Sequence, residues 1–176
     1  VEISYARQSF NTENVGATLG LGQNFKFGVD VFGAKVRLFG DAVKDQDTWL
    51  PQVSAGVQYK RNNQADVLRA IGAQSASGTD WYIAATKLFL DQSVLVNATI
   101  RATKANQIGI LGFGGDGNNS YRAEFEGSVA YLVRRDVAIG AEFRSKPDNL
   151  RIAKESDWWD LFIAWAPTKN IALTLA

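Results

Sequence analysis

The stretch "TWLPQVSAGVQYK" at residues 48–60 alternates between two kinds of side chain. One set is apolar or aromatic and comprises Trp49, Pro51, Val53, Ala55, Val57 and Tyr59. The other set is mainly small or polar and comprises Leu50, Gln52, Ser54, Gly56, Gln58 and Lys60. Successive side chains of a β-strand point to opposite faces of the sheet, so this period of two predicts a strand with one apolar and one polar face.

Two later segments repeat the pattern. Within 120–133, Tyr121, Ala123, Phe125, Val129, Tyr131 and Val133 alternate with Arg122, Glu124, Glu126 and Ser128. Within 93–104, Val94, Val96, Ala98 and Ile100 alternate with Asn97, Thr99, Arg101 and Thr103. The segment 79–90 is apolar on both faces, so its two faces stay unassigned. The recurrence indicates a sheet built from strands of one kind.

Period two predicts about nine strands in all. They lie near residues 1–10, 24–40, 48–60, 79–90, 93–104, 120–133, 137–146, 157–167 and 170–176. Long connections at 11–23, 61–78, 105–119 and 147–156 alternate with short ones at 41–47, 91–92, 134–136 and 168–169. This alternation is typical of outer-membrane barrels, which have long extracellular loops and short periplasmic turns. We therefore expect a single all-β domain over 1–176, an antiparallel up-and-down transmembrane β-barrel, with one short helix in "ADVLRAIGA" at 65–73.

The composition argues against several classes of function. The chain has no His and no Cys, which excludes disulfides and every Ser-His or Cys-His relay within these residues. Its 19 Lys and Arg balance 18 Asp and Glu, so nothing points to a nucleic-acid partner. We expect no enzymatic activity, no cofactor and no metal site.

A glycine-rich segment spells G-x-G-x-x-G at 112–117. A dinucleotide site needs this motif between a strand and a helix, and here both flanks are predicted strands. The segment, with Gly112, Gly114, Gly115, Asp116, Gly117 and Asn118, is therefore interpreted as the mobile tip of a long extracellular hairpin. Asp116, Asn118 and Asn119 offer oxygen ligands for calcium, but a single copy of such a repeat is weak support for a site.

The aromatic residues help to decide which face meets water. Alternation alone fits both a membrane barrel and a soluble barrel with an apolar core. Eight aromatic residues fall near predicted strand ends and form a candidate girdle: Trp49, Tyr59, Trp81, Tyr121, Tyr131, Trp158, Trp159 and Trp165. Tyr and Trp collect at bilayer interfaces, so their placement favours the membrane barrel.

Five segments resemble a proteobacterial family known as domain of unknown function 3034. They are "LPQVSAGVQYK", "GTDWYIAATKLFL", "NATIRATKANQIGILGFGG", "GAEFRSKPDNL" and "DWWDLFIAWAPTKNIALTLA". The resemblance implies an outer-membrane β-barrel exported through a cleaved signal, with no established activity. It also implies further strands after Ala176, so we expect the chain to be truncated at both ends and the complete barrel to have about ten to twelve strands.

The strongest polar constellation is a charge ladder on the predicted lumen face: Arg101, Arg122, Glu124, Glu126, Glu142, Arg144 and Asp160. Neighbouring strands are about 5 Å apart, so opposite charges at these positions can pair across the wall. A charged constriction or an acid and base pair is one interpretation. A set of salt bridges that fills a narrow barrel is the simpler one.

These patterns lead to a functional hypothesis. We expect a non-enzymatic barrel of the bacterial outer membrane, in contact with lipid, that acts as a narrow conduit or as a structural subunit of an envelope complex. Other envelope proteins or further copies of the chain are the expected partners. A transporter of small hydrophobic molecules and a soluble ligand-binding barrel are the alternatives, and the soluble barrel requires the Val94, Val96, Ala98 and Ile100 face to point inward.

Overall fold

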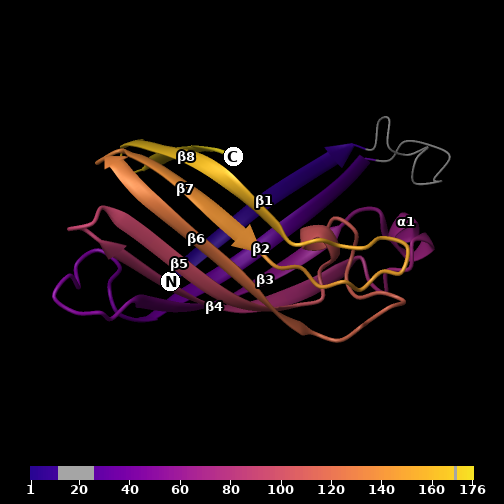
Figure 1. Cartoon of the computed structure of the whole chain (residues 1–176). Helices are drawn as coiled ribbons and strands as arrows, with labels where there is room; N and C mark the ends of the chain where they lie inside the picture. Colours follow the sequence, from indigo (N-terminus) through magenta and orange to yellow (C-terminus); the bar gives the residue numbers. More distant parts are fainter. Residues whose placement is uncertain (12–25, 169) are drawn as a thin grey trace.

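Antiparallel strands form one continuous sheet in the computed structural model, which describes residues 1–11, 26–168 and 170–176. Over these residues the strands are β1 (Glu2–Asn11), β2 (Lys26–Phe39), β3 (Gln52–Asn62), β4 (Ser77–Phe89), β5 (Val94–Thr103), β6 (Arg122–Arg134), β7 (Val137–Arg144), β8 (Trp158–Thr168) and β9 (Ile171–Leu175). Each strand pairs with the next one in the chain, and the up-and-down sheet curls into a half-barrel (Figure 1). The predicted all-β fold of about nine strands is confirmed.

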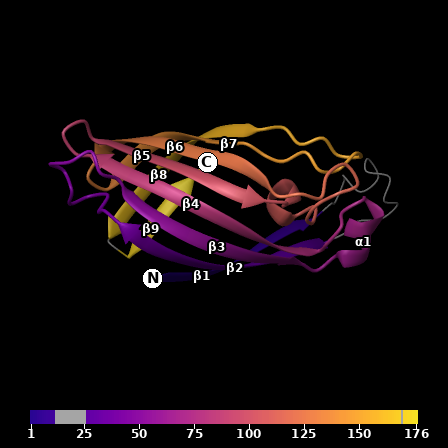
Figure 2. The ribbon, with the colours of Figure 1, turned by 90° about the horizontal axis from the view of Figure 1, so that it is seen from below.

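The connections divide the sheet into two ends, which Figures 1 and 2 show from two directions. Connections 63–76, 104–121 and 145–157 gather at one end, here called the loop end. Connections 40–51, 90–93 and 135–136 lie at the other, here called the turn end. The connection 40–51 is longer than predicted because β3 begins at Gln52 instead of Thr48. Pro51 has no N–H to donate to a neighbouring strand, which fits this start.

Only short helices occur among the described residues. The loop end carries α1 (Ala65–Ala70) and the 3-10 turn η1 (Asn106–Gly109). Neither approaches the length of a helix that could cross a membrane. The helix predicted within 65–73 is confirmed, and Gly72, with φ of +96°, follows its last turn. Asn11 ends β1, and the rest of the predicted long connection, residues 12–23, lies outside the described residues, as does Lys169 of the last predicted turn.

The two faces of the sheet differ sharply in burial. On β5, Thr99 and Arg101 are each 6% exposed on the face that we call inner, whereas Ile100 is 58% exposed on the opposite, outer face. The register carries the same division to β4, where Asp80 is fully buried and Trp81 is exposed. The faces predicted for 48–60, 93–104 and 120–133 are confirmed from Gln52 onward. The inner face is the polar one.

A cluster of buried apolar side chains lies at the loop end of the sheet. Phe27, Leu68, Ala73 and Leu150 form a buried cluster at the loop end, with Val67 and Ile71 of the helical segment packed against it. Leu68 is completely buried. Burial of apolar side chains in the described residues therefore orders the long connections, while the inside of the strands combines polar side chains with buried apolar ones such as Val29 and Val31 of β2.

Candidate functional site: the charged interior and its loop cover

A fully buried ion pair lies on the inner face near the loop end. Lys60 of β3 and Asp80 of β4 are 2% and 0% exposed, and their Nζ and Oδ2 atoms are 2.7 Å apart. The Thr103 hydroxyl donates a hydrogen bond of 2.6 Å to Asp80 Oδ1. Both carboxylate oxygens of Asp80 thus have a close partner. A buried charge needs such partners because its transfer out of water costs several kcal/mol. The attraction to an ideally placed opposite charge is about as large and offsets that cost.

Arg101 extends this pair across the next two strands. Its Nε and Nη2 donate to the two carboxylate oxygens of Glu126, at 2.6 and 3.1 Å. Its Nη1 donates to Gln58 Oε1 at 2.9 Å and lies 3.9 Å from Asp80 Oδ2. Arg144 Nη2 reaches the same Glu126 Oε1 at 2.8 Å. The two-point contact between Arg101 and Glu126 fixes both side chains in one geometry.

The aromatic ring of Tyr82 packs against Arg101. The Arg101 guanidinium carbon lies 4.8 Å from the centre of the Tyr82 ring, a cation-π distance. The ring in turn fills the space above Gly56, where a Cβ would come within 2.3 Å of it. Glycine at 56 thus allows the ring to approach β3 closely. We name Lys60, Asp80, Arg101, Glu126 and Arg144 the interior charge network.

Only some residues of the predicted charge ladder form ion pairs with one another. Arg101, Glu126 and Arg144 take part in ion pairs as described above. Glu124 instead accepts a 2.6 Å hydrogen bond from the Ser145 hydroxyl. Glu142 and Asp160 are direct cross-strand partners, so two carboxylates face each other there. Arg122 is exposed at the start of β6.

Sequence reasoning missed Lys60 and Asp80, the most buried members of the network. Lys60 was placed on the polar face of its strand but not in the ladder, and the faces of the segment containing Asp80 were unassigned. A signal did exist. Asp80 is the one acidic residue in the strand "SGTDWYIAATKLF", and a lone carboxylate in such an apolar strand indicates the inner face.

Loop residues 104–115 cover the network at the loop end. Phe113 is 3% exposed, and its backbone N–H and C=O pair with Ser75 at 2.8 and 3.1 Å. Its ring occupies the space that a side chain at Gly78 would need. Gly112 and Gly114, with φ of +79° and +60°, turn the chain on either side of Phe113. We call residues 104–115 the loop cover.

The first half of the predicted hairpin tip is therefore not exposed at the end of the loop. Gly112, Gly114 and Gly115 are buried because the segment folds back onto two other loops, and only Asp116 and Gly117 of the predicted tip are exposed. Asn118 is partly buried and donates a 2.8 Å hydrogen bond to Asn149. The absence of a following helix agrees with the interpretation of the glycine motif as a loop.

Buried asparagines hold the loop cover in place. Asn106 is fully buried, and its Nδ2 donates to the carbonyl oxygens of Gly114 and Leu111, at 2.9 and 3.2 Å. Asn149, also fully buried, donates to Asn106 Oδ1 at 2.9 Å. Asn62 of β3 donates to the carbonyl oxygen of Ile110 at 2.8 Å. These amides satisfy loop carbonyls that have no sheet partner, so they substitute for secondary structure.

The positions considered for calcium serve as loop contacts. Asp116 Oδ1 accepts a hydrogen bond of 3.0 Å from the Arg151 backbone N–H. Asn118 donates to Asn149, as above, and Asn119 is exposed. Within the described ranges, no three acidic, His or Cys side chains group as metal ligands would.

A strained pair of residues sits in the middle of the loop cover. Gln107 and Ile108 have φ of +44° and +64°, a region that β-branched residues such as Ile rarely adopt. The Glu155 carboxylate accepts the Gln107 N–H at 3.0 and 2.9 Å, and Lys146 Nζ donates to Gln107 Oε1 at 3.0 Å. Burial raises the pKa of Glu155 above its ordinary value. Two charged side chains thus hold a strained turn over the network.

Of the eight aromatic residues predicted to form the girdle, seven are exposed and one is not. Trp49, Tyr59, Trp81, Tyr121, Tyr131, Trp159 and Trp165 are all exposed. Trp158 is partly buried and pairs with Arg144 in the sheet, which puts it on the inner face. Because neighbouring residues of a strand alternate, Trp158 and Trp159 cannot both face outward, and the girdle loses Trp158.

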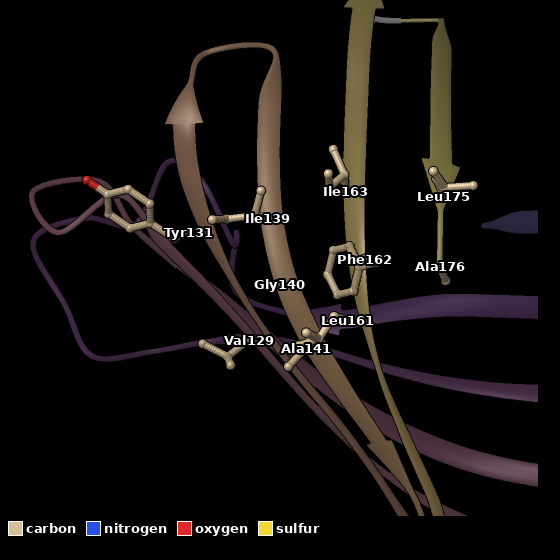
Figure 3. Close-up of a pocket in the computed structure, with 10 residues that line it drawn as sticks. All are labelled: Val129, Tyr131, Ile139, Gly140, Ala141, Leu161, Phe162, Ile163, Leu175 and Ala176. Atoms are coloured by element: carbon tan, nitrogen blue, oxygen red, sulfur yellow. The ribbon is translucent and has the colours of Figure 1, made fainter.

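The outer face is also hollowed on its β6–β9 side. A groove of about 810 Å³ is lined almost entirely by apolar side chains. Figure 3 shows that Val129, Ile139, Leu161 and Ile163, from three adjacent strands, contribute to its wall. Among the described residues no charged side chain lines this groove, so it continues the apolar character of the outer face.

Together these features define an up-and-down antiparallel sheet that forms a half-barrel, with a charged interior, a loop cover and an apolar exterior. The chain belongs to the family described as "Protein of unknown function (DUF3034)", whose model matches residues 1–176. Comparisons with the curated proteins and with the solved structures gave no match.

Proposed function

We propose that this protein is an integral β-barrel protein of the bacterial outer membrane, with a closed interior, that acts as a structural subunit of an envelope complex or as a narrow conduit. The observation that carries the proposal is the inverted burial of the sheet. Lys60, Asp80 and Arg101 lie inside, while large apolar side chains such as Ile100 and Leu161 lie outside, at 58% and 66% exposed.

The free energy of hydration explains why this inversion points to lipid. Each large apolar side chain left in water forgoes about 1.5–3 kcal/mol of burial. Soluble proteins rarely expose apolar patches beyond a few hundred Å², whereas here β4 to β8 all present such side chains outward. A hydrocarbon environment removes this cost, and backbone hydrogen bonds on both sides satisfy the main chain of β2 to β8 inside a bilayer, whereas β1 and β9 are paired on one side among the described residues.

The interior supports a narrow or closed passage. The interior charge network spans β3 to β7. Its ion pairs within β3–β4 and within β5–β7 have distances of 2.6–2.8 Å, and Arg101 and Asp80, 3.9 Å apart, connect the two groups. The loop cover lies over its loop end, with Ile108, Arg101 and Glu126 lining a common small recess. A wide, water-filled pore would need this centre to be open.

The two alternatives have less support. The soluble ligand-binding barrel requires the face of Val96 and Ile100 to point inward, and both residues are exposed on the outer face. A transporter of hydrophobic molecules would use the apolar loop segment 108–115 to contact its cargo, whereas Phe113 of this segment is buried in the loop cover. We therefore retain the integral barrel as the single proposal.

Site-specific labelling tests the proposal. Single Cys residues replace Val96 and Ile100 on the outer face, or Asn97 and Thr99 on the inner face, in the protein within outer-membrane vesicles. We expect a lipid-soluble thiol reagent to label the outer pair and to spare the inner pair. If a membrane-impermeant reagent labels Val96→Cys and Ile100→Cys instead, that face meets water and the proposal fails.

A further inference from the structure

A second pocket lies on the outer face at the turn end, away from the interior charge network. It has a volume of about 490 Å³ and lies between residues 46–49, the end of β4, the turn 90–92 and the start of β5. Its wall combines charged residues with apolar and aromatic ones. Pockets of this size hold small ligands or parts of larger ones.

The segment that forms one wall of this pocket is fixed to the sheet. Gln46 Nε2 donates to the Leu88 carbonyl oxygen at 3.0 Å, and Gln46 Oε1 accepts the Leu90 N–H at 3.3 Å. The Leu88 N–H also donates to the Ala42 carbonyl oxygen at 2.9 Å. The segment 42–46 thus pairs with the free edge at the end of β4, beyond Gln52 where β3 begins. The pocket is preformed, which lowers the entropic cost of binding.

The base of the pocket holds a buried cation that forms no ion pair with the described part of the chain. Lys87 is 6% exposed, and its ammonium donates to the backbone carbonyl oxygens of Asp45 and Leu50. Among the described residues these are its polar partners, and no carboxylate there forms an ion pair with it. An ammonium has three donors, so one remains for a ligand. A buried, uncompensated positive charge favours an anionic group within reach.

The rim of the pocket carries the opposite charge. Asp47 and Asp91 both line it and both are exposed. With Lys87 they give the pocket one positive charge at its base and two negative charges at its rim. A purely anionic ligand would be repelled by this rim, whereas a zwitterion with an inner anion and an outer cation matches both charges.

The remaining wall of the pocket is apolar and can contact a hydrocarbon chain. Val94 and Val96 lie on the outer face of β5, beside Phe89. Trp49 contacts the Phe89 ring at a centroid distance of 5.8 Å and is 86% exposed. A Trp at this level, between a polar rim and an apolar wall, is typical of the bilayer interface.

We infer that this pocket binds one zwitterionic phospholipid, with the phosphate at Lys87, a primary ammonium headgroup at Asp47 and Asp91, and an acyl chain along Val94 and Val96. The inference rests on the proposed function, since it needs the outer face to lie in a bilayer with the turn end at one interface. In that setting the ligand is present as a component of the membrane itself.

Lipid retention measured by native mass spectrometry tests the inference. The protein is released from detergent micelles supplied with phosphatidylethanolamine, phosphatidylglycerol or diacylglycerol of the same acyl chains. We expect one retained phosphatidylethanolamine per protein, less phosphatidylglycerol, and no diacylglycerol. Lys87→Gln should reduce retention about fivefold to tenfold, as expected for the loss of one charged contact at the membrane surface. Lys44→Gln, in the same connection but exposed, is the matched control and should retain the lipid.

Trp49→Ala provides a second variant, because its side chain is largely exposed and its loss leaves the buried cation in place. It should also weaken retention. Equal retention of diacylglycerol, or equal retention by Lys87→Gln and Lys44→Gln, would overturn the inference. Retention of phosphatidylglycerol as strong as that of phosphatidylethanolamine would overturn the role of Asp47 and Asp91. The thiol labelling at Val96 and Ile100 reports on membrane insertion separately, so insertion without retention defeats this inference alone.

Discussion

Neighbouring residues of β5 lie on opposite faces of the sheet, and the environments of the two faces differ completely. Thr99 and Arg101 are nearly inaccessible, and the intervening Ile100 is more than half exposed. In a water-soluble sheet the difference would have the opposite sign, with Ile100 buried and Arg101 in water. The comparison teaches that the folded chain gathers polar groups on its inner face and leaves apolar side chains on the outer one, which is the arrangement that the proposed membrane barrel requires.

The largest effect on stability is expected from removing an ion pair of the inner face. Asp80→Ala leaves the Lys60 ammonium, 2% exposed, without its carboxylate partner. We expect a loss of about 3–5 kcal/mol in the free energy of unfolding, because an unpaired charge remains buried. Urea unfolding of the protein in lipid vesicles, followed by tryptophan fluorescence, measures it. A change no larger than that of Asp66→Ala, at a fully exposed carboxylate, would contradict the inner-face account.

A charged substitution on the outer face distinguishes a lipid environment from an aqueous one. Ile100→Arg should cost about 2–4 kcal/mol if this position lies near the bilayer midplane. On a water-exposed surface the same change stays within about 0.5 kcal/mol. The same vesicle titration measures both cases, with Ile100→Val as the conservative control. A near-zero cost for Ile100→Arg would place water, not lipid, at this face.

A smaller and more local effect is expected in the loop cover. Asn106→Ala removes the donor to the Gly114 and Leu111 carbonyl oxygens and the acceptor for Asn149. Leaving buried polar groups unpaired costs about 1–3 kcal/mol. Hydrogen exchange should therefore speed up in residues 104–115 and remain slow in β4 and β5. Equal acceleration in the strands would mean that the cover and the sheet unfold as one unit.

The smallest expected effect is a pH dependence of the stability of the loop cover. Burial raises the pKa of Glu155, so the folded loop keeps the proton to a higher pH than the unfolded chain does. This contribution to stability is fully present below the unfolded pKa and is lost as pH rises through the folded pKa. Exchange at Gln107 and its neighbours, corrected for the intrinsic rate, should therefore increase with rising pH in the acid range. Glu155→Gln should flatten the slope, and an unchanged slope would exclude Glu155 as its source.

The strands could be predicted from sequence because period two is a local signal. It gave the order, the approximate bounds and the faces of β3, β5 and β6. The interior charge network was found only in part, since Asp80 lies in a strand whose apolar residues fall on both faces and hide the alternation. The loop cover was missed because Asn106, Asn149 and Phe113 are ordered by contacts between distant segments, which leave no periodic trace.

Adjacent residues Trp158 and Trp159 offer the most direct test of the central claim that the outer face meets lipid. Trp159 is 70% exposed on the outer face, whereas Trp158 pairs with Arg144 on the inner face. Two variants that each keep one of them, with the other four tryptophans of the chain changed to Phe, can be reconstituted with brominated lipid. The account predicts strong quenching of Trp159 fluorescence and little quenching of Trp158. Equal quenching of the two, or quenching of Trp158 alone, would contradict it.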